Sequence, residues 1–158
     1  MNDFLRTALC VLAAVIAPIS VSGQNAPVVT ASGNQLYCPG TSLNIVTDFN
    51  INNTGNTSAE AVYIQISSGY VNGADLLSLN TSIPNVATSW DAIAGKLTIS
   101  GVSGQEVPYA TLINAVENVI YTSTSPNPSG IRTFSITLGD ANYLPSTQHY
   151  YRFIPAIG

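Results

Sequence analysis

Apolar and polar residues alternate along much of the chain, and this alternation predicts β-strands. Segment 43–51 has mostly apolar odd positions, and segment 61–67 places Val62, Ile64 and Ile66 on one face with polar or aromatic residues between them. A period of two is typical of a strand that buries one face. We therefore expect a strand at 43–51 and a second strand, at 61–67, that crosses the core.

Turn-forming clusters of Asn, Asp, Gly, Ser and Pro separate these and several further apolar runs. The clusters lie at 52–58, 72–73, 91–95 and 125–130. Their side chains bond to the local backbone or tolerate positive φ, which favours turns. Further strands are predicted at 76–79, 86–90, 96–100, 119–122, 132–138 and 149–154. Short strands at this spacing predict an all-β sandwich or barrel.

One segment has helical rather than strand periodicity. Tyr109, Leu112, Ile113 and Val116 recur at helical spacing after Pro108, a residue suited to a first helical turn. The spacing predicts one short helix over 108–117, closing one end of the sandwich. Among the aromatic residues, Trp90 and Tyr121 are expected in the core.

The first twenty-three residues have the pattern of a cleavable signal peptide. A short polar start is followed by an apolar run over 8–19, interrupted by Pro18, and by small residues at 21–23. The run is too short to span a bilayer. We expect cleavage after Gly23, with no transmembrane segment remaining, and a secreted or cell-surface location.

The charge of the predicted mature chain, residues 24–158, limits the classes of partner that it can bind. Residues 24–158 hold seven acidic side chains but only three basic ones, Lys96, Arg132 and Arg152, which are far apart in sequence. Nucleic acids and anionic membranes both require clustered Lys and Arg, so we expect neither as a partner. The length suits a single domain with one core.

Cys38 is the single cysteine of the predicted mature chain, because Cys10 lies in the predicted signal peptide. An internal disulfide is then excluded. Two interpretations remain: a bridge to another chain or to a segment absent from this sequence, or, as we favour, a buried small apolar residue.

Little in the sequence points to catalysis. His149 is the only histidine and lies in a predicted strand, where a surface position is favoured over the role of general base. A hydrolytic triad of His149 with Asp140 and a serine has no nucleophile-elbow motif to support it. One Cys and one His cannot form a tetrahedral zinc site. We therefore predict that the chain is not an enzyme.

A calcium site is harder to exclude than a zinc site, because calcium binds the oxygens of Asp, Asn and main-chain carbonyls. Asp75 at 72–75, and Asp140 with Asn142 at 140–142, are candidate ligands. Each loop offers one carboxylate, which favours plain turns and no cofactor over a calcium site. Asn52, Asn56 and Asn80 begin N-x-Ser/Thr triplets, which Asn- and Thr-rich loops also produce by chance.

Tyrosines expected at the surface give an alternative function. An exposed aromatic ring can stack on the apolar face of a sugar, as in carbohydrate-binding modules. Tyr63 and Tyr150 are the principal candidates, although half-buried strand positions also favour tyrosine for packing alone. The full set expected at the surface is Tyr37, Tyr63, Tyr70, Tyr143, Tyr150 and Tyr151.

Several stretches together resemble the cadherin-like, immunoglobulin-type modules of large secreted surface proteins of gliding bacteria. The stretches are 63–77, 88–91, 95–101, 119–122, 127–130 and 132–136. Segment 139–154 is similar to the junction at which such proteins continue into a C-type lectin-like domain. The resemblance implies an immunoglobulin/cadherin-like sandwich from a longer protein of type IX secretion and gliding motility. The family's acidic calcium motifs between repeats are not matched.

These observations predict four parts: a signal peptide at 1–23, an N-terminal linker at 24–35, the cadherin-like domain at 36–142, and a truncated, unpaired junction at 143–158. We expect a non-catalytic extracellular module, a spacer or presentation platform in an adhesin. Its partners are expected to be other domains of the parent chain, or surface glycans or proteins. A strand left without its neighbour also favours self-association.

Overall fold

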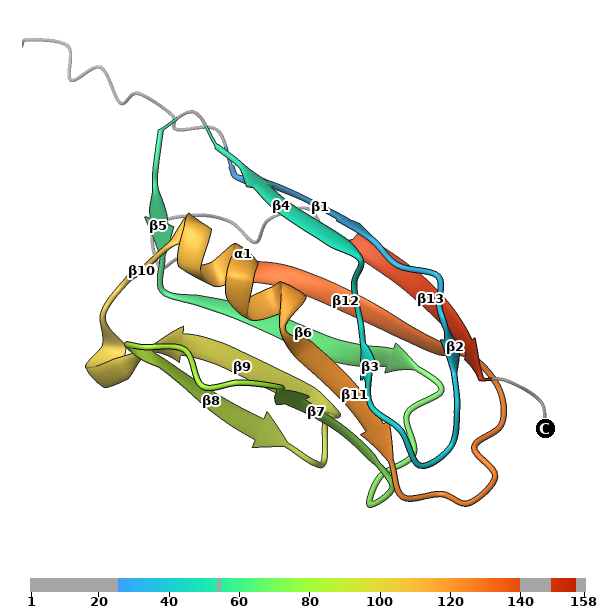
Figure 1. The fold of residues 1–158 in the computed structure, drawn as a ribbon. Coiled ribbons are helices and arrows are strands. Elements are labelled where there is room, and N and C mark those ends of the chain that lie inside the picture. The colour runs from blue at the N-terminus through green and yellow to red at the C-terminus, as the bar shows by residue number, and fades with distance from the viewer. Residues whose placement is uncertain (1–25, 54, 140–148, 156–158) are drawn as a thin grey trace, which may run out of the picture.

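The computed structural model describes residues 26–53 and 55–139, and the backbone of 149–155. The strands are β1 Val28–Ser32, β2 Leu36–Tyr37, β3 Leu43–Asn44, β4 Asp48–Asn52, β5 Ser58–Ala59, β6 Ala61–Ser68, β7 Asp75–Leu79, β8 Val86–Asp91, β9 Lys96–Gly101, β10 Val107–Pro108, β11 Val119–Ser123, β12 Arg132–Gly139 and β13 His149–Pro155. A 3₁₀ turn, η1, covers Val102–Gly104, and the helix α1 covers Tyr109–Glu117 (Figure 1).

The larger of the two layers is a six-stranded sheet with the order β2-β13-β12-β6-β9-β8. Its central strands are antiparallel, with Ile64 of β6 paired to Ile136 of β12 and to Leu97 of β9. Because directly paired residues share a face, these three apolar residues form one row on the inner side. β2 is the exception in direction, because it runs parallel to β13.

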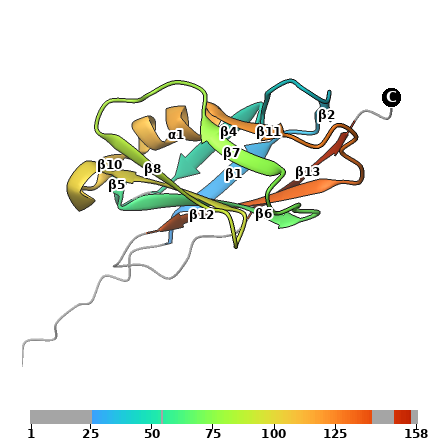
Figure 2. The ribbon, with the colours of Figure 1, turned by 90° about the horizontal axis from the view of Figure 1, so that it is seen from below.

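The second layer covers the inner face of this sheet. It consists of the three-stranded sheet β3-β11-β7, the pair β1-β4 and the helix α1. Seen in Figure 2, these elements lie together over β6, β12 and β13, and the fold is an all-β sandwich with one helix. The fold class predicted from the sequence is therefore confirmed.

The core lies between the two layers and follows the predicted alternation. From β6, Val62, Ile64 and Ile66 are all at most 3% exposed, whereas Tyr63 between them is 37% exposed. The second layer contributes residues from β4, β11 and α1. The fully buried members include Val29, Leu77, Leu97, Ile99, Leu112, Val116, Phe134 and Ile136.

The helix α1 agrees with the predicted segment to within one residue. Leu112 and Val116 are fully buried, and α1 packs mainly against β4. It therefore occupies a place in the second layer beside β4, over the large sheet (Figure 1). At its C-terminal end, the Asn44 side-chain amide donates to the carbonyl of Glu117 at 2.7 Å, which satisfies one of the carbonyls that a helix end leaves open.

The strand predicted at 43–51 is two strands. β3 pairs with β11, whereas β4 pairs with β1, so the chain changes partner between them. Ile45 and Val46 at the break are both buried. The alternation runs on through the break, so it gave no sign that the two halves have different neighbours. The other predicted strands, from 61–67 to 149–154, are all present.

Two strands lie in ranges expected to be outside the domain. β1 lies within 24–35 and pairs with β4 over its five residues. β13 lies within 143–158, where an unpaired segment was expected, but it pairs antiparallel with β12 from Arg132 to Ile136 and parallel with β2. Both are strands of the sandwich.

The described chain enters and leaves the sandwich at opposite ends. β1 begins at the end near β5 and β10, and β13 finishes at the far end, beside the loops that follow β2 and β11 (Figure 1). Figure 2 shows the same separation from below. In the part of the chain that the structure describes, no helix is long and apolar enough to cross a membrane.

Candidate functional site

A buried ion pair joins the two layers of the sandwich. Arg132 at the start of β12 donates from Nε to Oδ2 of Asp75 at 2.7 Å, and from Nη2 to Oδ1 at 3.4 Å. Asp75 begins β7 in the opposite layer, and both residues are at most 3% exposed. Arg132 also donates from Nη1 to the carbonyl of Ser129 at 2.8 Å. The pair thus links β7, β12 and the loop before β12.

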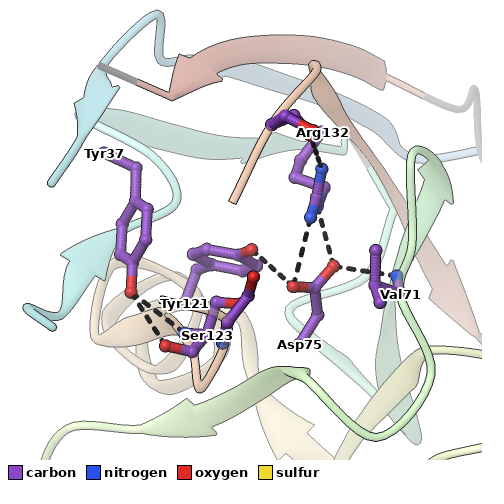
Figure 3. Close-up of polar contacts among 8 residues, drawn as sticks. Tyr37, Val71, Asp75, Tyr121, Ser123 and Arg132 are labelled. Atoms are coloured by element: carbon purple, nitrogen blue, oxygen red, sulfur yellow. Dashed lines mark hydrogen bonds and ion pairs between the residues drawn. The ribbon is translucent and has the colours of Figure 1, made fainter. Parts of the chain in front are cut away.

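The Tyr121 hydroxyl and the Val71 N–H also bond to Asp75, and Tyr37 lies close by, as Figure 3 shows. The Tyr121 hydroxyl donates to Oδ1 of Asp75 at 2.7 Å, and the backbone N–H of Val71 donates to Oδ2 at 2.9 Å. Nearby, the Tyr37 hydroxyl accepts from the N–H of Ser123 at 3.0 Å and donates to the Thr41 carbonyl at 3.1 Å. The rings of Tyr37 and Tyr121 meet edge to face at 4.9 Å.

The network keeps Asp75 ionised. Burial alone would raise the pKa of Asp75, but hydrogen bonds from Arg132, Tyr121 and Val71 and the charge of Arg132 lower that pKa below its ordinary value. Burial and the hydrogen bond to Asp75 raise the pKa of the Tyr121 hydroxyl, so this group stays protonated. The pKa of Arg132 would be lowered by burial and is raised by its bonds to Asp75.

The ion pair was not predicted from the sequence. The available signal was an acid and a base, each placed at the first residue of an apolar strand, in a chain with few charges. Nothing in the spacing of Asp75 and Arg132, 57 positions apart, shows that they meet. Their contact depends on how the two layers are stacked.

Of the three calcium candidates, the structure describes Asp75. Both carboxylate oxygens of Asp75 accept hydrogen bonds from protein donors, so a calcium ion there would have to displace Arg132. Asp140 and Asn142 lie outside the described residues. Within the described residues no three His, Cys, Asp or Glu side chains come together.

The outer face of the large sheet carries the sugar-binding candidate Tyr63. A Cβ added at Gly139 would lie 2.4 Å from Cε2 of Tyr63, so the ring lies directly over this glycine of the neighbouring strand. The Lys96 ammonium lies 5.7 Å from the centre of the same ring. Thr98 and Thr137 pair directly with Tyr63 on either side. Around the Tyr63 ring this face is therefore polar.

The remaining tyrosine candidates divide into three groups. Tyr37 was expected at the surface, but it is 1% exposed because its ring packs on Tyr121 and its hydroxyl bonds to the backbone of Ser123. Tyr70 is partly buried: its hydroxyl donates to the Ala92 carbonyl at 2.6 Å. In the pairing of β12 with β13, Tyr150 lies opposite Ser135. The candidate base His149 lies opposite Ile136 in the same pairing. Tyr143 lies outside the described residues, and nothing beyond its backbone register is described for Tyr151.

Two predictions about single residues need correction. Trp90 is only partly buried, because β8 is the last strand of its sheet, and it packs edge to face on Tyr70 with ring centres 6.1 Å apart.

Cys38, for which we favoured a buried position, is exposed. It lies in the turn after β2, where its carbonyl accepts both the N–H and the hydroxyl of Thr41. The preceding residue, Tyr37, takes the inward position. Tyr121 is buried as predicted.

Comparison with known proteins gives little further guidance. No protein-family model and no curated protein matches the sequence. Among solved structures, the chain is similar to a cohesin module from a family 33 glycoside hydrolase of Clostridium perfringens, at 9% identity and a TM-score of 0.47, over 84% of this chain and 98% of that one. A likeness at this level supports no inference about function.

Proposed function

We propose that this chain is a non-catalytic module of an exported surface protein, serving as a spacer or presentation platform for other domains of the same protein. The single observation that carries the proposal is the position of the two ends. The chain enters at one end of the sandwich and leaves at the other (Figure 1). A module that holds two neighbours apart requires this arrangement.

The pairing of β2 with β13, the last described strand, suits the same role. β2 and β13 lie side by side and run parallel, with Leu36 opposite Ile154 and Tyr37 opposite Pro155. Tension that passes through β1 to β2 draws β2 and β13 past one another along their length. Their hydrogen bonds then share the load, whereas antiparallel strands pulled from one end open bond by bond. The buried pair Asp75–Arg132 resists separation of the layers behind them.

Single-molecule stretching tests this function. The chain held by its two ends should unfold at a clearly higher force than the same chain held at its N-terminus and at a cysteine replacing Ile93, in the turn between β8 and β9. Ile93 is 89% exposed, so the attachment should leave the fold intact. Equal forces in the two geometries would argue against a spacer that carries tension.

Export is a separate part of the proposal and has its own test. The pattern at 1–23 supports cleavage after Gly23, so the protein recovered outside the cell should begin at Gln24. N-terminal sequencing gives the answer directly. A protein retained in the cytoplasm with residues 1–23 intact would overturn the surface role and leave the stretching result untouched.

A second candidate function is carbohydrate binding by the outer face of the large sheet. It is favoured by the Tyr63 ring, which is 37% exposed beside Lys96 on a face lined with threonine hydroxyls. A glycan array with the purified chain tests it. Binding that survives Tyr63→Phe and is lost in Tyr63→Ala would support this function over a passive spacer, because the phenyl ring alone is enough for stacking. An array with no bound glycan would remove the candidate.

A further inference from the structure

The two edges of the six-stranded sheet differ in how well they are protected. At one edge, β2 is only two residues long. At the other edge, β8 has six residues and is paired, among the described strands, only with β9. Ala87, Thr88 and Ser89 in the middle of β8 are exposed. Among the residues that the structure describes, β8 therefore forms a long edge with no strand beyond it.

β8 lacks the features that usually prevent edge strands from pairing with other chains. Such edges are commonly protected by Lys, by Pro or by a bulge. β8 contains neither Lys nor Pro, and its pairing with β9 is regular from Val86 to Asp91. Its one charged side chain, Asp91, is at the last position and accepts the N–H groups of Ile93 and Ala94 in the following turn. A strand whose first five positions carry no charge favours addition of another strand.

We propose that β8 is a self-association edge that pairs antiparallel with β8 of a second copy of this chain, about a two-fold axis at Thr88. In this register each Thr88 faces its own copy. Val86 then lies opposite Trp90 of the second copy, and Ala87 lies opposite Ser89, so each pair occurs twice. The two large sheets become one continuous sheet. This inference does not depend on the proposed spacer function.

The sequence of β8 favours a second copy over a different partner because it is self-complementary in this register. Thr88 and the two Val86–Trp90 contacts are on the inner side, because Thr88 pairs with Ile99 and Trp90 with Leu97, both buried. Threonine pairs and aromatic pairs with β-branched residues are favourable cross-strand neighbours. Asp91 of each copy lies at opposite ends of the interface, so the two carboxylates do not face each other. A two-fold axis at Ser89 would instead place Asp91 opposite Ala87.

Charge substitutions at Thr88 test the proposed register. Sedimentation velocity of the purified chain should show a concentration-dependent dimer. Thr88→Lys and Thr88→Glu should each weaken it by at least about tenfold, because like charges meet on the axis. An equimolar mixture of the two variants should restore association, since Lys then faces Glu. Thr30→Lys is the matched control, because Thr30 is exposed on β1 in the other layer, and it should leave the dimer unchanged.

A cysteine at the axis gives a second measurement that does not depend on affinity. In a chain with Cys10 and Cys38 replaced by Ser, Thr88→Cys should form an intermolecular disulfide on mild oxidation, because residues directly opposite each other lie within disulfide reach. Ser89→Cys is the control: two copies of position 89 are offset along the strands and should not cross-link. Circular dichroism checks that each variant is folded.

Three results would overturn the inference. They are a monomer at all concentrations in the unsubstituted chain, a dimer that persists equally in both charge variants, and cross-linking that is as efficient through position 89 as through position 88. A dimer that cross-links equally well through positions 88 and 89 would pair β8 in another register or associate through another surface.

Discussion

The inner and outer faces of strand β6 differ in burial and in the side chains that they carry. On the inner face, Val62, Ile64 and Ile66 are closed off from water, and the network around Asp75 and Arg132 lies in the same interior. On the outer face, Tyr63 and Gln65 stand among hydroxyl side chains. The interior thus holds an acid and a base in one fixed contact, while the outer face carries hydroxyl and amide side chains and the Lys96 ammonium.

This difference indicates where the structure depends on single groups. A buried charge without its partner is costly, whereas a surface side chain exchanges one solvated environment for another. The interior should therefore respond strongly to single substitutions, and the outer face weakly.

The largest effect is expected from Asp75→Asn. The substitution leaves Arg132 charged and buried without a counter-ion, which should lower the free energy of unfolding by about 3–5 kcal/mol. Urea denaturation followed by circular dichroism measures it. The double variant Asp75→Leu with Arg132→Met is the control and should lose less than the single variant, because it removes both charges. Equal losses would mean that the charge itself matters little.

Ile64→Ala should cost about 3 kcal/mol. Ile64 is fully buried in the middle of the large sheet, and truncation leaves a cavity that the neighbouring strands cannot fill. The same denaturation experiment applies. Ile64→Val, which removes one methylene, is expected to lose about 1 kcal/mol. A loss in Ile64→Ala no larger than in Ile64→Val would mean that the core collapses around the site.

Acid should weaken the fold through Asp75 by less than its substitution does. The pKa of Asp75 is below its ordinary value in the folded state, so its contribution is complete above the pKa of the unfolded chain, near pH 4, and is lost as the pH falls through the folded pKa. The protonated acid still forms hydrogen bonds, which limits the loss. Urea midpoints between about pH 7 and pH 2 should fall less steeply in Asp75→Asn than in the unsubstituted chain. Parallel curves would contradict this assignment.

The smallest effect is expected from Tyr63→Ala on the outer face. The ring covers Gly139 and lies near Lys96, contacts that remain partly in water. The loss should be below about 1 kcal/mol. A loss as large as that of Ile64→Ala, measured side by side, would remove the contrast between the two faces.

Much of the fold could be predicted from local patterns. The alternation in 61–67 specified β6 and its buried face, and the spacing after Pro108 specified α1. The prediction failed where the pattern was continuous but the partners changed, as between β3 and β4. It also failed at Cys38 and Tyr37, which are adjacent. Alternation requires one of the two to face inward, but it does not say which.

The candidate site was harder to predict for a related reason. Tyr63 was found because it interrupts an apolar strand with an aromatic residue. The network of Tyr37, Asp75, Tyr121 and Arg132 joins four segments that are distant in sequence. No one of these segments has an unusual pattern when taken alone.

The sequence by itself determined the strands, the single helix and the sandwich class, because each depends on periodicity within a few residues. Only the tertiary structure decided which strands are neighbours, that Asp75 meets Arg132, and that β8 forms an open edge. These depend on the stacking of two layers and on sheet order, in which contacts form between residues far apart along the chain. The energy of such contacts belongs to pairs of segments, and no single segment carries a record of its partner.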